Sequence, residues 1–137
     1  MVDTRFSVSI QIMMTLAAHN DELVNSELLS KVLKTNPTFV RKLVSNLVSA
    51  NLITSFRGKG GGIKIATDPS NISLREIYCA STQEKTLVKV HKKPVSKTCS
   101  VSCCINDVLQ SVVSGIEQST HKYLEGKTLN DLMSQVK

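Results

Sequence analysis

Apolar side chains recur every three or four residues along much of this 137-residue chain, and that period is typical of helices with one buried face. In the first such stretch Phe6, Ile10, Met13, Met14 and Ala17 form one stripe, and the two methionines are interpreted as core residues. Together with capping residues, the pattern predicts helices over 4–19, 26–34, 37–50, 73–79, 102–125 and 128–135. Two short β-prone runs, 53–56 and 63–66, lie between the third and fourth helices.

The second and third predicted helices are separated by about three residues, and this spacing is typical of a helix-turn-helix. Asn36 and Pro37 predict the start of the third helix, because asparagine caps unpaired N–H groups and proline suits the first helical position. Asn51 is expected to end it in a left-handed conformation. One face of this helix is apolar, and the opposite face carries Thr38, Arg41, Lys42, Ser45 and Asn46.

The two β-prone runs flank a basic, glycine-rich segment, residues 57–62, and are expected to form a hairpin. Two helices followed by such a hairpin predict a winged helix-turn-helix. The expected fold class is therefore mainly α with a small β-hairpin wing and a long C-terminal helix. We expect a winged helix-turn-helix domain over residues 1–80, a basic, cysteine-containing loop over 81–101, and a dimerisation helix with a short final helix over 102–137.

Positive charge is concentrated in one part of the chain. The forty residues 28–67 contain no Asp or Glu, but they contain Lys31, Lys34, Arg41, Lys42, Arg57, Lys59 and Lys64. Solvated faces ordinarily carry both signs, so this stretch predicts a surface that binds a polyanion such as double-stranded DNA. The net charge of +6 and the pI near 9.3 agree with this prediction. A second basic segment, Ser81–Thr98, is expected to be a solvated loop, with DNA backbone contact as the alternative.

Three segments resemble one known family. The segment Leu52–Ala66, with its Arg-Gly-x-Gly-Gly-Gly turn, is similar to the wing of the Rrf2 family of bacterial transcription regulators. The segments Arg5–Ala17 and Ile72–Ile77 fit the same family, so the resemblance covers essentially the whole chain. It implies a sequence-specific DNA-binding regulator, with repression as the expected mode, and it implies that the long helix is the dimerisation helix.

The third helix and the wing supply the expected DNA contacts. Arg41 can pair with the O6 and N7 atoms of guanine, while Lys42 and Lys34 suit phosphate. The cations of the wing suit the negative potential of a minor groove. The predicted set is Asn36, Thr38, Arg41, Lys42, Ser45, Asn46, Arg57 and Lys59. Any one of these residues, considered alone, could instead be an ordinary solvated surface residue that makes no DNA contact.

The long C-terminal helix has an apolar stripe that a small domain cannot cover by itself. It consists of Ile105, Val108, Leu109, Val112, Val113, Ile116, Tyr123 and Leu124. A second copy of the chain is the simplest partner for such a stripe, which predicts a homodimer. Two recognition helices related by two-fold symmetry in turn predict a pseudo-palindromic operator.

Three cysteines, Cys99, Cys103 and Cys104, lie just before or at the start of this helix. In the cluster-binding members of the Rrf2 family, three more widely spaced cysteines of this region hold an iron–sulfur cluster. Here the spacing is compressed, and adjacent cysteines cannot easily ligate one metal. We therefore expect no cofactor, and an iron–sulfur cluster held by these three cysteines remains the alternative.

A thiol switch is the preferred interpretation of these cysteines. Cys99 followed by Ser-Val is similar to family members with a single cysteine, where Pro-Val usually follows, and nearby lysines favour a thiolate. Oxidised Cys99 would then condense with Cys103 or Cys104, within one chain or across a dimer. A third interpretation treats them as small buried hydrophobic residues, which is also the prediction for Cys79.

Several classes of protein are not expected. The chain has no apolar run of about 18 residues that could span a membrane, and it has no signal-peptide pattern, which predicts a cytoplasmic protein. An enzyme is not expected either, since phosphate-cradling, metalloprotease and serine-elbow motifs are missing. A winged-helix module that binds another protein is a remote alternative, but it would not need Arg57 and Lys59 on a glycine-rich turn.

Overall fold

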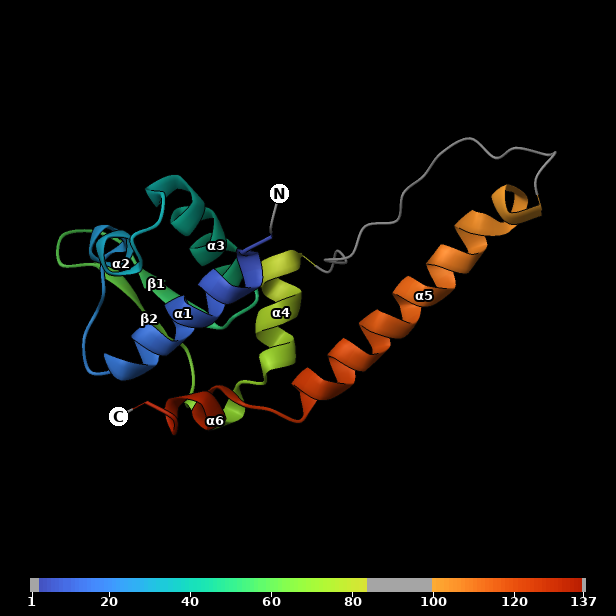
Figure 1. Cartoon of the computed structure of the whole chain (residues 1–137). Helices are drawn as coiled ribbons and strands as arrows, with labels where there is room; N and C mark the ends of the chain where they lie inside the picture. Colours follow the sequence, from blue (N-terminus) through green and yellow to red (C-terminus); the bar gives the residue numbers. More distant parts are fainter. Residues whose placement is uncertain (1–2, 84–99, 137) are drawn as a thin grey trace.

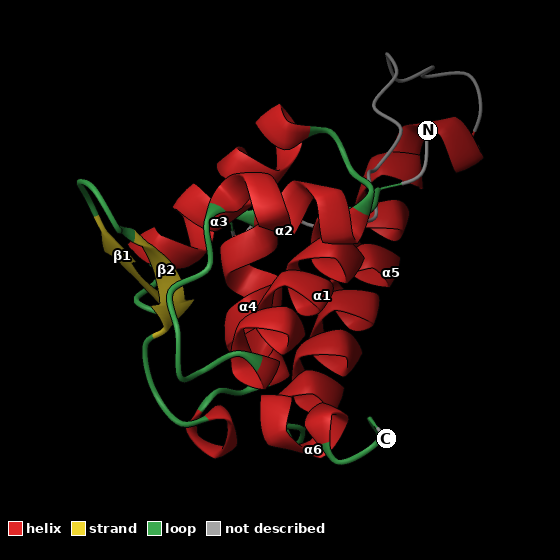
Figure 2. Ribbon diagram, turned by 90° about the vertical axis from the view of Figure 1, so that its left-hand side faces the viewer, coloured by secondary structure: helices red, strands yellow, loops and turns green. Residues whose placement is uncertain are grey.

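The computed structural model describes residues 3–83 and 100–136, and its architecture confirms the predicted fold class (Figure 1). The elements, in chain order, are α1 (Arg5–Ala18), α2 (Ser26–Leu33), α3 (Pro37–Ser49), β1 (Ile53–Phe56), β2 (Gly62–Ile65), the 3-10 turn η1 (Pro69–Asn71), α4 (Leu74–Thr82), α5 (Ser100–Glu125) and α6 (Leu129–Met133). Residues 3–83, from before α1 to the end of α4, are called the winged domain below. Figure 2 shows the β1–β2 hairpin at one edge of the helices and α5 at the opposite edge.

The core of the winged domain is built around α1, which contacts α2, α3, α4, α6 and β2. Ile12, Met13 and Leu16 of α1 are fully buried, which agrees with the interpretation of Met13 as a core residue. The other helices and the hairpin contribute Leu29, Val40, Leu43, Leu47, Ile53, Ile63, Ile65, Leu74 and Ile77. One apolar core therefore holds the helix-turn-helix and the wing together.

Asparagine side chains delimit the helices of the helix-turn-helix, largely as the sequence predicted. The Oδ1 atom of Asn25 accepts a hydrogen bond from the N–H of Leu28 at 2.7 Å, at the start of α2. Asn36 caps α3 in the same way, accepting from the N–H of Thr38 at 2.8 Å. Beyond the end of α3, Asn51 has a φ of 64°, the left-handed conformation that asparagine tolerates well.

Main-chain hydrogen bonds attach the wing to the segment between α1 and α2. β1 and β2 pair in antiparallel register, and Val24 adds an isolated bridge at the outer side of β2. The N–H of Val24 donates to the carbonyl of Ile63 at 2.9 Å, and the N–H of Ile63 donates back at 2.8 Å. The base of the hairpin is thereby held against the helices, since both of these side chains are also buried in the core.

α4 is longer than predicted. It ends at Thr82, whereas the hydrophobic pattern predicted an end at Cys79. Ser81 and Thr82 are buried, and their hydroxyl groups donate to the carbonyl oxygen of Tyr78 at 3.0 and 2.8 Å. These bonds satisfy both hydroxyls inside the helix, which explains why polar residues expected to open the basic loop continue the helix instead. The rest of that predicted loop, residues 84–99, lies outside the described residues.

α5 begins at Ser100, before the predicted start at Ser102, and has 26 residues. At 1.5 Å per residue it is about 39 Å long. Its C-terminal part lies against α4, and its N-terminal part extends away from the winged domain (Figure 1). Within residues 3–83 and 100–136, no helix is both long and apolar enough to span a bilayer.

α6 returns the end of the chain to the winged domain. It starts with a capping box, in which the Oγ1 of Thr128 accepts from the N–H of Asp131 at 3.2 Å and the carboxylate accepts in return at 2.9 Å. The N–H of Leu129 donates to the carbonyl of Ile72 at 2.9 Å, and the Leu129 side chain is fully buried. In the part of the chain that the structure describes, the two ends of α5 therefore differ, because the C-terminal end alone is tied to the core.

Candidate nucleic-acid interface

The acid-free stretch folds into most of α2, all of α3 and the hairpin. Every cation in it is exposed: Lys31, Lys34, Arg41, Lys42, Arg57, Lys59 and Lys64. None of these seven forms an ion pair with any residue that the structure describes. Arg5 differs, because its side chain is hydrogen-bonded to Asp3 at 2.7 Å, which raises the pKa of the guanidinium. A concentration of exposed cations without acidic partners favours binding to a phosphate backbone.

α3 has one buried and one exposed face, as its pattern predicted. The apolar residues Val40, Leu43 and Leu47 are at most 1 % exposed and attach the helix to the core. On the other side the predicted contact residues Thr38, Arg41, Lys42 and Ser45 are exposed. Nη2 of Arg41 lies 3.5 Å from Oγ1 of Thr38, a long contact that leaves the guanidinium largely available. The first turns of α3 therefore present a hydroxyl and a guanidinium to solvent.

Two of the predicted DNA contacts also have structural roles. The side-chain oxygen Oδ1 of Asn36 caps α3, and Oδ1 of Asn46 accepts a hydrogen bond from Nε2 of Gln83 at 3.2 Å. Both asparagines keep their side-chain NH₂ groups as donors. Gln83, at the end of α4, was not predicted from the sequence, because it lies 37 residues from Asn46 and no local pattern marks it. It holds one residue of α3 in place without belonging to the helix-turn-helix.

A groove of about 300 Å³ lies between α2 and α3. Its lining consists of Ser26, Glu27, Ser30, Lys31, Pro37 and Arg41. The fold thus brings Lys31 of the first helix to the same groove as Arg41 of the second, with the Glu27 carboxylate also in the lining. The sequence had identified Lys31 by its charge alone, and its position beside α3 places it near the predicted contact surface.

Arg57 and Lys59 are exposed at the tip of the wing, as predicted. The turn that carries them depends on glycine, since Gly58 and Gly60 have φ values of 96° and 81°. A side chain at Gly61 would collide with a main-chain carbonyl oxygen of β1. The two cations therefore project from a compact turn that few other sequences could form.

The structure describes part of the predicted cysteine set. Cys104 is exposed in the first turns of α5. Cys79 is half-buried against the core, in agreement with its interpretation as a small hydrophobic residue. Cys99 lies outside the described residues, and only the backbone of Cys103 is described.

The backbone at the start of α5 bears on an iron–sulfur cluster held by all three cysteines. Positions 103 and 104 are consecutive in α5, so they lie about 100° apart around the helix axis. Neighbouring helical positions do not face one another, whereas a cluster needs thiolates that converge. Within the described residues, no three His, Cys, Asp or Glu side chains are grouped as a metal ion would require.

The apolar stripe of α5 is only partly covered by this chain. Val113 and Leu124 are each 6 % exposed, and Leu124 packs in the core of the winged domain. Val108, Val112, Ile116 and Tyr123, by contrast, are 53, 55, 42 and 65 % exposed. The first three are four residues apart, so they form one continuous face along the helix. The described residues of a single chain leave this face in solvent.

The arrangement of a capped recognition helix, an exposed polar face and a basic glycine-turn wing defines the winged helix-turn-helix class of DNA-binding proteins. Residues 2–135 match the model of the Rrf2 family, described as iron-dependent transcriptional regulators. This chain belongs to that family of DNA-binding transcription regulators, which confirms the resemblance inferred from the wing.

Individual relatives agree with this assignment. The chain is 32 % identical over 136 residues to YwnA of Bacillus subtilis (strain 168), provisionally named an HTH-type transcriptional regulator, and the match covers 99 % of each chain. The structure of CymR from B. subtilis has a TM-score of 0.67 at 22 % identity, covering 100 % of this chain and 98 % of that one. T. potens IscR has a TM-score of 0.70 at 23 % identity, covering 100 % and 88 %. The two structures show the shared fold, and the family consists of transcriptional regulators rather than enzymes.

Proposed function

We propose that this protein is a homodimeric, cytoplasmic repressor of transcription that binds a pseudo-palindromic operator in double-stranded DNA. The observation that carries the proposal is the set of seven exposed cations on α2, α3 and the wing, none of them in an ion pair within the described residues. Neutralisation of phosphates by such cations supplies affinity that does not depend on sequence. Membership of the Rrf2 family supports the same role.

Sequence preference would come from the exposed face of α3. A recognition helix enters the major groove with its N-terminal residues toward the base edges, and Thr38 and Arg41 lie in those turns. Arg41 pairs with the O6 and N7 atoms of guanine, and Lys42 neutralises a phosphate beside it. Arg57 and Lys59 of the wing suit the negative potential of the neighbouring minor groove.

Dimerisation would use the exposed face of α5. Val108, Val112 and Ile116 form an apolar row that the same row of a second copy can cover. Such a two-fold dimer presents two copies of α3 to one duplex, so that the operator consists of two related half-sites.

The base-reading role can be tested with two single substitutions. Duplexes enriched from a random library by the wild-type protein supply a consensus sequence, and a scrambled duplex supplies the reference. We expect Arg41→Ala to weaken binding to the consensus by roughly 10- to 100-fold and to the scrambled duplex much less. Lys42→Ala should weaken both alike and reduce the salt dependence by about one counterion.

Lys127→Ala is the matched control, because it removes an exposed cation outside the acid-free stretch, beside Tyr123. It should leave both affinities unchanged. Equal losses of Arg41→Ala on the consensus and scrambled duplexes would contradict a base-reading role. Equal losses for Lys127→Ala and Lys42→Ala would contradict the assignment of the interface to α3.

We further propose that oxidation of Cys99 regulates DNA binding. Its thiolate attacks a hydroperoxide, the O–O bond breaks, and an alcohol or water leaves once protonated, so that a sulfenic acid remains. The thiol of Cys103 or Cys104 then attacks that sulfur, water leaves, and a disulfide forms; the two thiols supply the two electrons that reduce the peroxide. The exposure of Cys104 in the first turns of α5 supports this, since a bridge there acts on the helix proposed for dimerisation.

A visible absorption spectrum of anaerobically purified protein, with iron and sulfide assays, separates this switch from a cluster. Colourless, iron-free protein whose DNA affinity changes on peroxide treatment supports the switch. The Cys99→Ser variant should then show no change in affinity with peroxide, and the Cys79→Ser variant should still show it. Brown protein with iron and sulfide would overturn it in favour of the iron–sulfur alternative, which the iron-dependent description of the family favours.

A further inference from the structure

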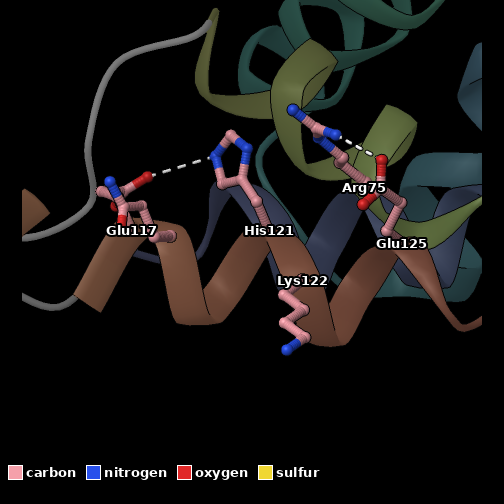
Figure 3. A pocket seen from close by; sticks show the side chains of 6 residues that line it. Arg75, Glu117, His121, Lys122 and Glu125 are labelled. Atoms are coloured by element: carbon pink, nitrogen blue, oxygen red, sulfur yellow. Dashed lines mark hydrogen bonds and ion pairs between the residues drawn. The ribbon is translucent and has the colours of Figure 1, made fainter. Parts of the chain in front are cut away.

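A polar cluster connects the winged domain to α5. It consists of Tyr78 on α4 with Glu117 and His121 on α5, and it is called the joint below. The hydroxyl of Tyr78 donates to Oε1 of Glu117 at 3.0 Å, with Oε2 at 3.3 Å. Nε2 of His121, one helical turn further along, lies 3.4 Å from Oε2 of the same carboxylate (Figure 3). The joint thus links two elements that are far apart in sequence.

Tyr78 extends the joint into the core. It is 3 % exposed, and its ring lies edge-on to Phe6 of α1 at 5.3 Å and to His121 at 5.6 Å. A buried tyrosine hydroxyl needs a hydrogen-bond partner, and Glu117, whose side chain is 17 % exposed, is that partner. Removing the hydroxyl would leave a mostly covered carboxylate with less to bond to. The orientation of α5 is therefore coupled to a buried part of the winged domain.

A groove of about 310 Å³ lies beside the joint. It is lined by Arg75, Glu117, Gln118, His121, Lys122 and Glu125. Arg75 of α4 pairs with Glu125 of α5 at 2.5 Å, and the Lys122 side chain points away from α4 (Figure 3). Because Arg75, Glu117, His121 and Glu125 are engaged with one another or with Tyr78, the groove is best explained as a seam between two helices.

The joint and the exposed apolar row lie on different sides of α5. At about 100° per residue, Val112 and Glu117 are separated by roughly 140° around the axis. One side of α5 therefore contacts its own winged domain, and the described residues leave the other side open to the second copy that the proposed function requires. In a two-fold dimer, a rotation at the joint occurs in both copies and moves the two recognition helices in opposite senses. The distance between them, and hence the half-site spacing, depends on the joint.

We propose that Tyr78 and Glu117 are positioning residues that set the half-site spacing accepted by the dimer. The inference rests on the proposed dimeric function and adds a specificity determinant that touches no DNA. With the hydrogen bond in place, one relative orientation of the two winged domains prevails and one spacing is preferred. Without it, several orientations have similar free energies, so that several spacings bind alike while the contacts within each half-site stay the same.

The test compares duplexes that carry two copies of the half-site enriched by the wild-type protein, with the spacer changed one base pair at a time. A duplex with a single half-site is measured beside them. We expect the wild type to bind its preferred spacing about tenfold more tightly than the neighbouring ones. Tyr78→Phe removes one oxygen and keeps the ring. It should reduce the difference in affinity between spacings to within about threefold and leave the affinity for the single half-site unchanged.

The joint offers matched controls. Ser111→Ala likewise removes one side-chain oxygen, at an exposed position of α5 that lies about 100° from Val112 and about 120° from Glu117 around the axis, and it should keep the wild-type preference. Glu117→Gln keeps a carbonyl oxygen that can accept from Tyr78, so it should also retain the preference, whereas Glu117→Ala should lose it. If thermal unfolding shows that Tyr78→Phe disturbs the fold, Glu117→Ala tests the same hydrogen bond from its α5 partner.

The outcomes separate the inference from the function on which it rests. If Tyr78→Phe and Glu117→Ala both prefer one spacing as strongly as the wild type does, the inference is overturned and the DNA-binding function still stands. Equal losses on the single half-site and on every spacing would also overturn it, because the residues would then serve folding alone. Wild-type protein that enriches no paired half-sites would show that the proposed dimeric function itself is wrong.

Discussion

The winged domain and α5 have the same helical hydrophobic period, but they bury it differently. In the winged domain, Ile12, Leu47 and Ile77 are fully buried within one chain. On α5, Val112 and Tyr123 are 55 and 65 % exposed. The same spacing of apolar residues therefore corresponds to a core in one region and, in the other, to a face that the described residues leave open. A periodic pattern identifies a face that needs cover without identifying what covers it.

Charged groups show the same contrast. Arg41, Lys42 and the wing cations are exposed and form no ion pairs within the described residues. Along the seam between α4 and α5, Arg75 pairs with Glu125 instead. Cations without acidic partners are available to a polyanion, whereas paired ones hold two helices together. Four substitutions, from the largest expected effect to the smallest, test this comparison.

The largest effect is expected in the core of the winged domain. Leu47→Ala should lower the free energy of unfolding by about 2–5 kcal/mol, because it leaves a cavity among fully buried side chains. Urea denaturation measures this, and Ser45→Ala, exposed on the same helix, should change it by less than about 0.5 kcal/mol. A loss below about 1 kcal/mol for Leu47→Ala would contradict a core completed within one chain.

On α5 we expect the opposite behaviour, a change in association rather than in folding. Val112→Glu should weaken self-association by at least about tenfold, because it puts a charge in the middle of an apolar face. Sedimentation velocity at several concentrations measures this. Gln110→Glu places the same charge on the other side of the helix and should have little effect. Unchanged association of Val112→Glu would show that this face is not the dimer interface.

An intermediate effect is expected at the start of α4. The hydroxyl of Ser73 accepts from the N–H of Glu76 at 3.1 Å in a capping box. Ser73→Ala should lower the free energy of unfolding by about 1 kcal/mol and leave self-association unchanged. Thermal unfolding and sedimentation of the same sample test both parts, with Ser73→Thr as the variant that keeps a capping hydroxyl. A loss of stability that depends on protein concentration would contradict the separation of the winged domain from the dimer face.

The smallest effect is expected at the outer end of the seam. Arg75 and Glu125 have side chains that are 42 and 61 % exposed, so solvent screens their attraction. Glu125→Gln should therefore lower the free energy of unfolding by less than about 1 kcal/mol. Thermal unfolding at low and high salt checks this, since the difference from wild type should shrink further in high salt. A larger loss of unfolding free energy that does not depend on salt would show that this pair, like the joint, is important for holding α4 and α5 together.

Local signals were sufficient to predict the helix-turn-helix and the wing. Asn36 with Pro37 predicted the start of α3, Asn51 its left-handed end, and the glycines after Arg57 the turn of the hairpin, and each is found as expected. These features depend on hydrogen bonds and dihedral angles within a few residues. The exposed face of α3 followed from the same helical period, although the DNA contacts assigned to it remain predictions.

The sequence by itself determined which segments are helical, which of their faces are apolar, and where positive charge gathers, because those properties depend on neighbours along the chain. Only the tertiary structure decided how the elements are joined. The bond from Gln83 to Asn46 spans 37 residues, and the bond from Tyr78 to Glu117 spans 39. No periodicity marks either pair, since each bond depends on two helices packing at one particular angle. The orientation of α5, and with it the proposed operator spacing, is therefore a property of packing between distant parts of the chain.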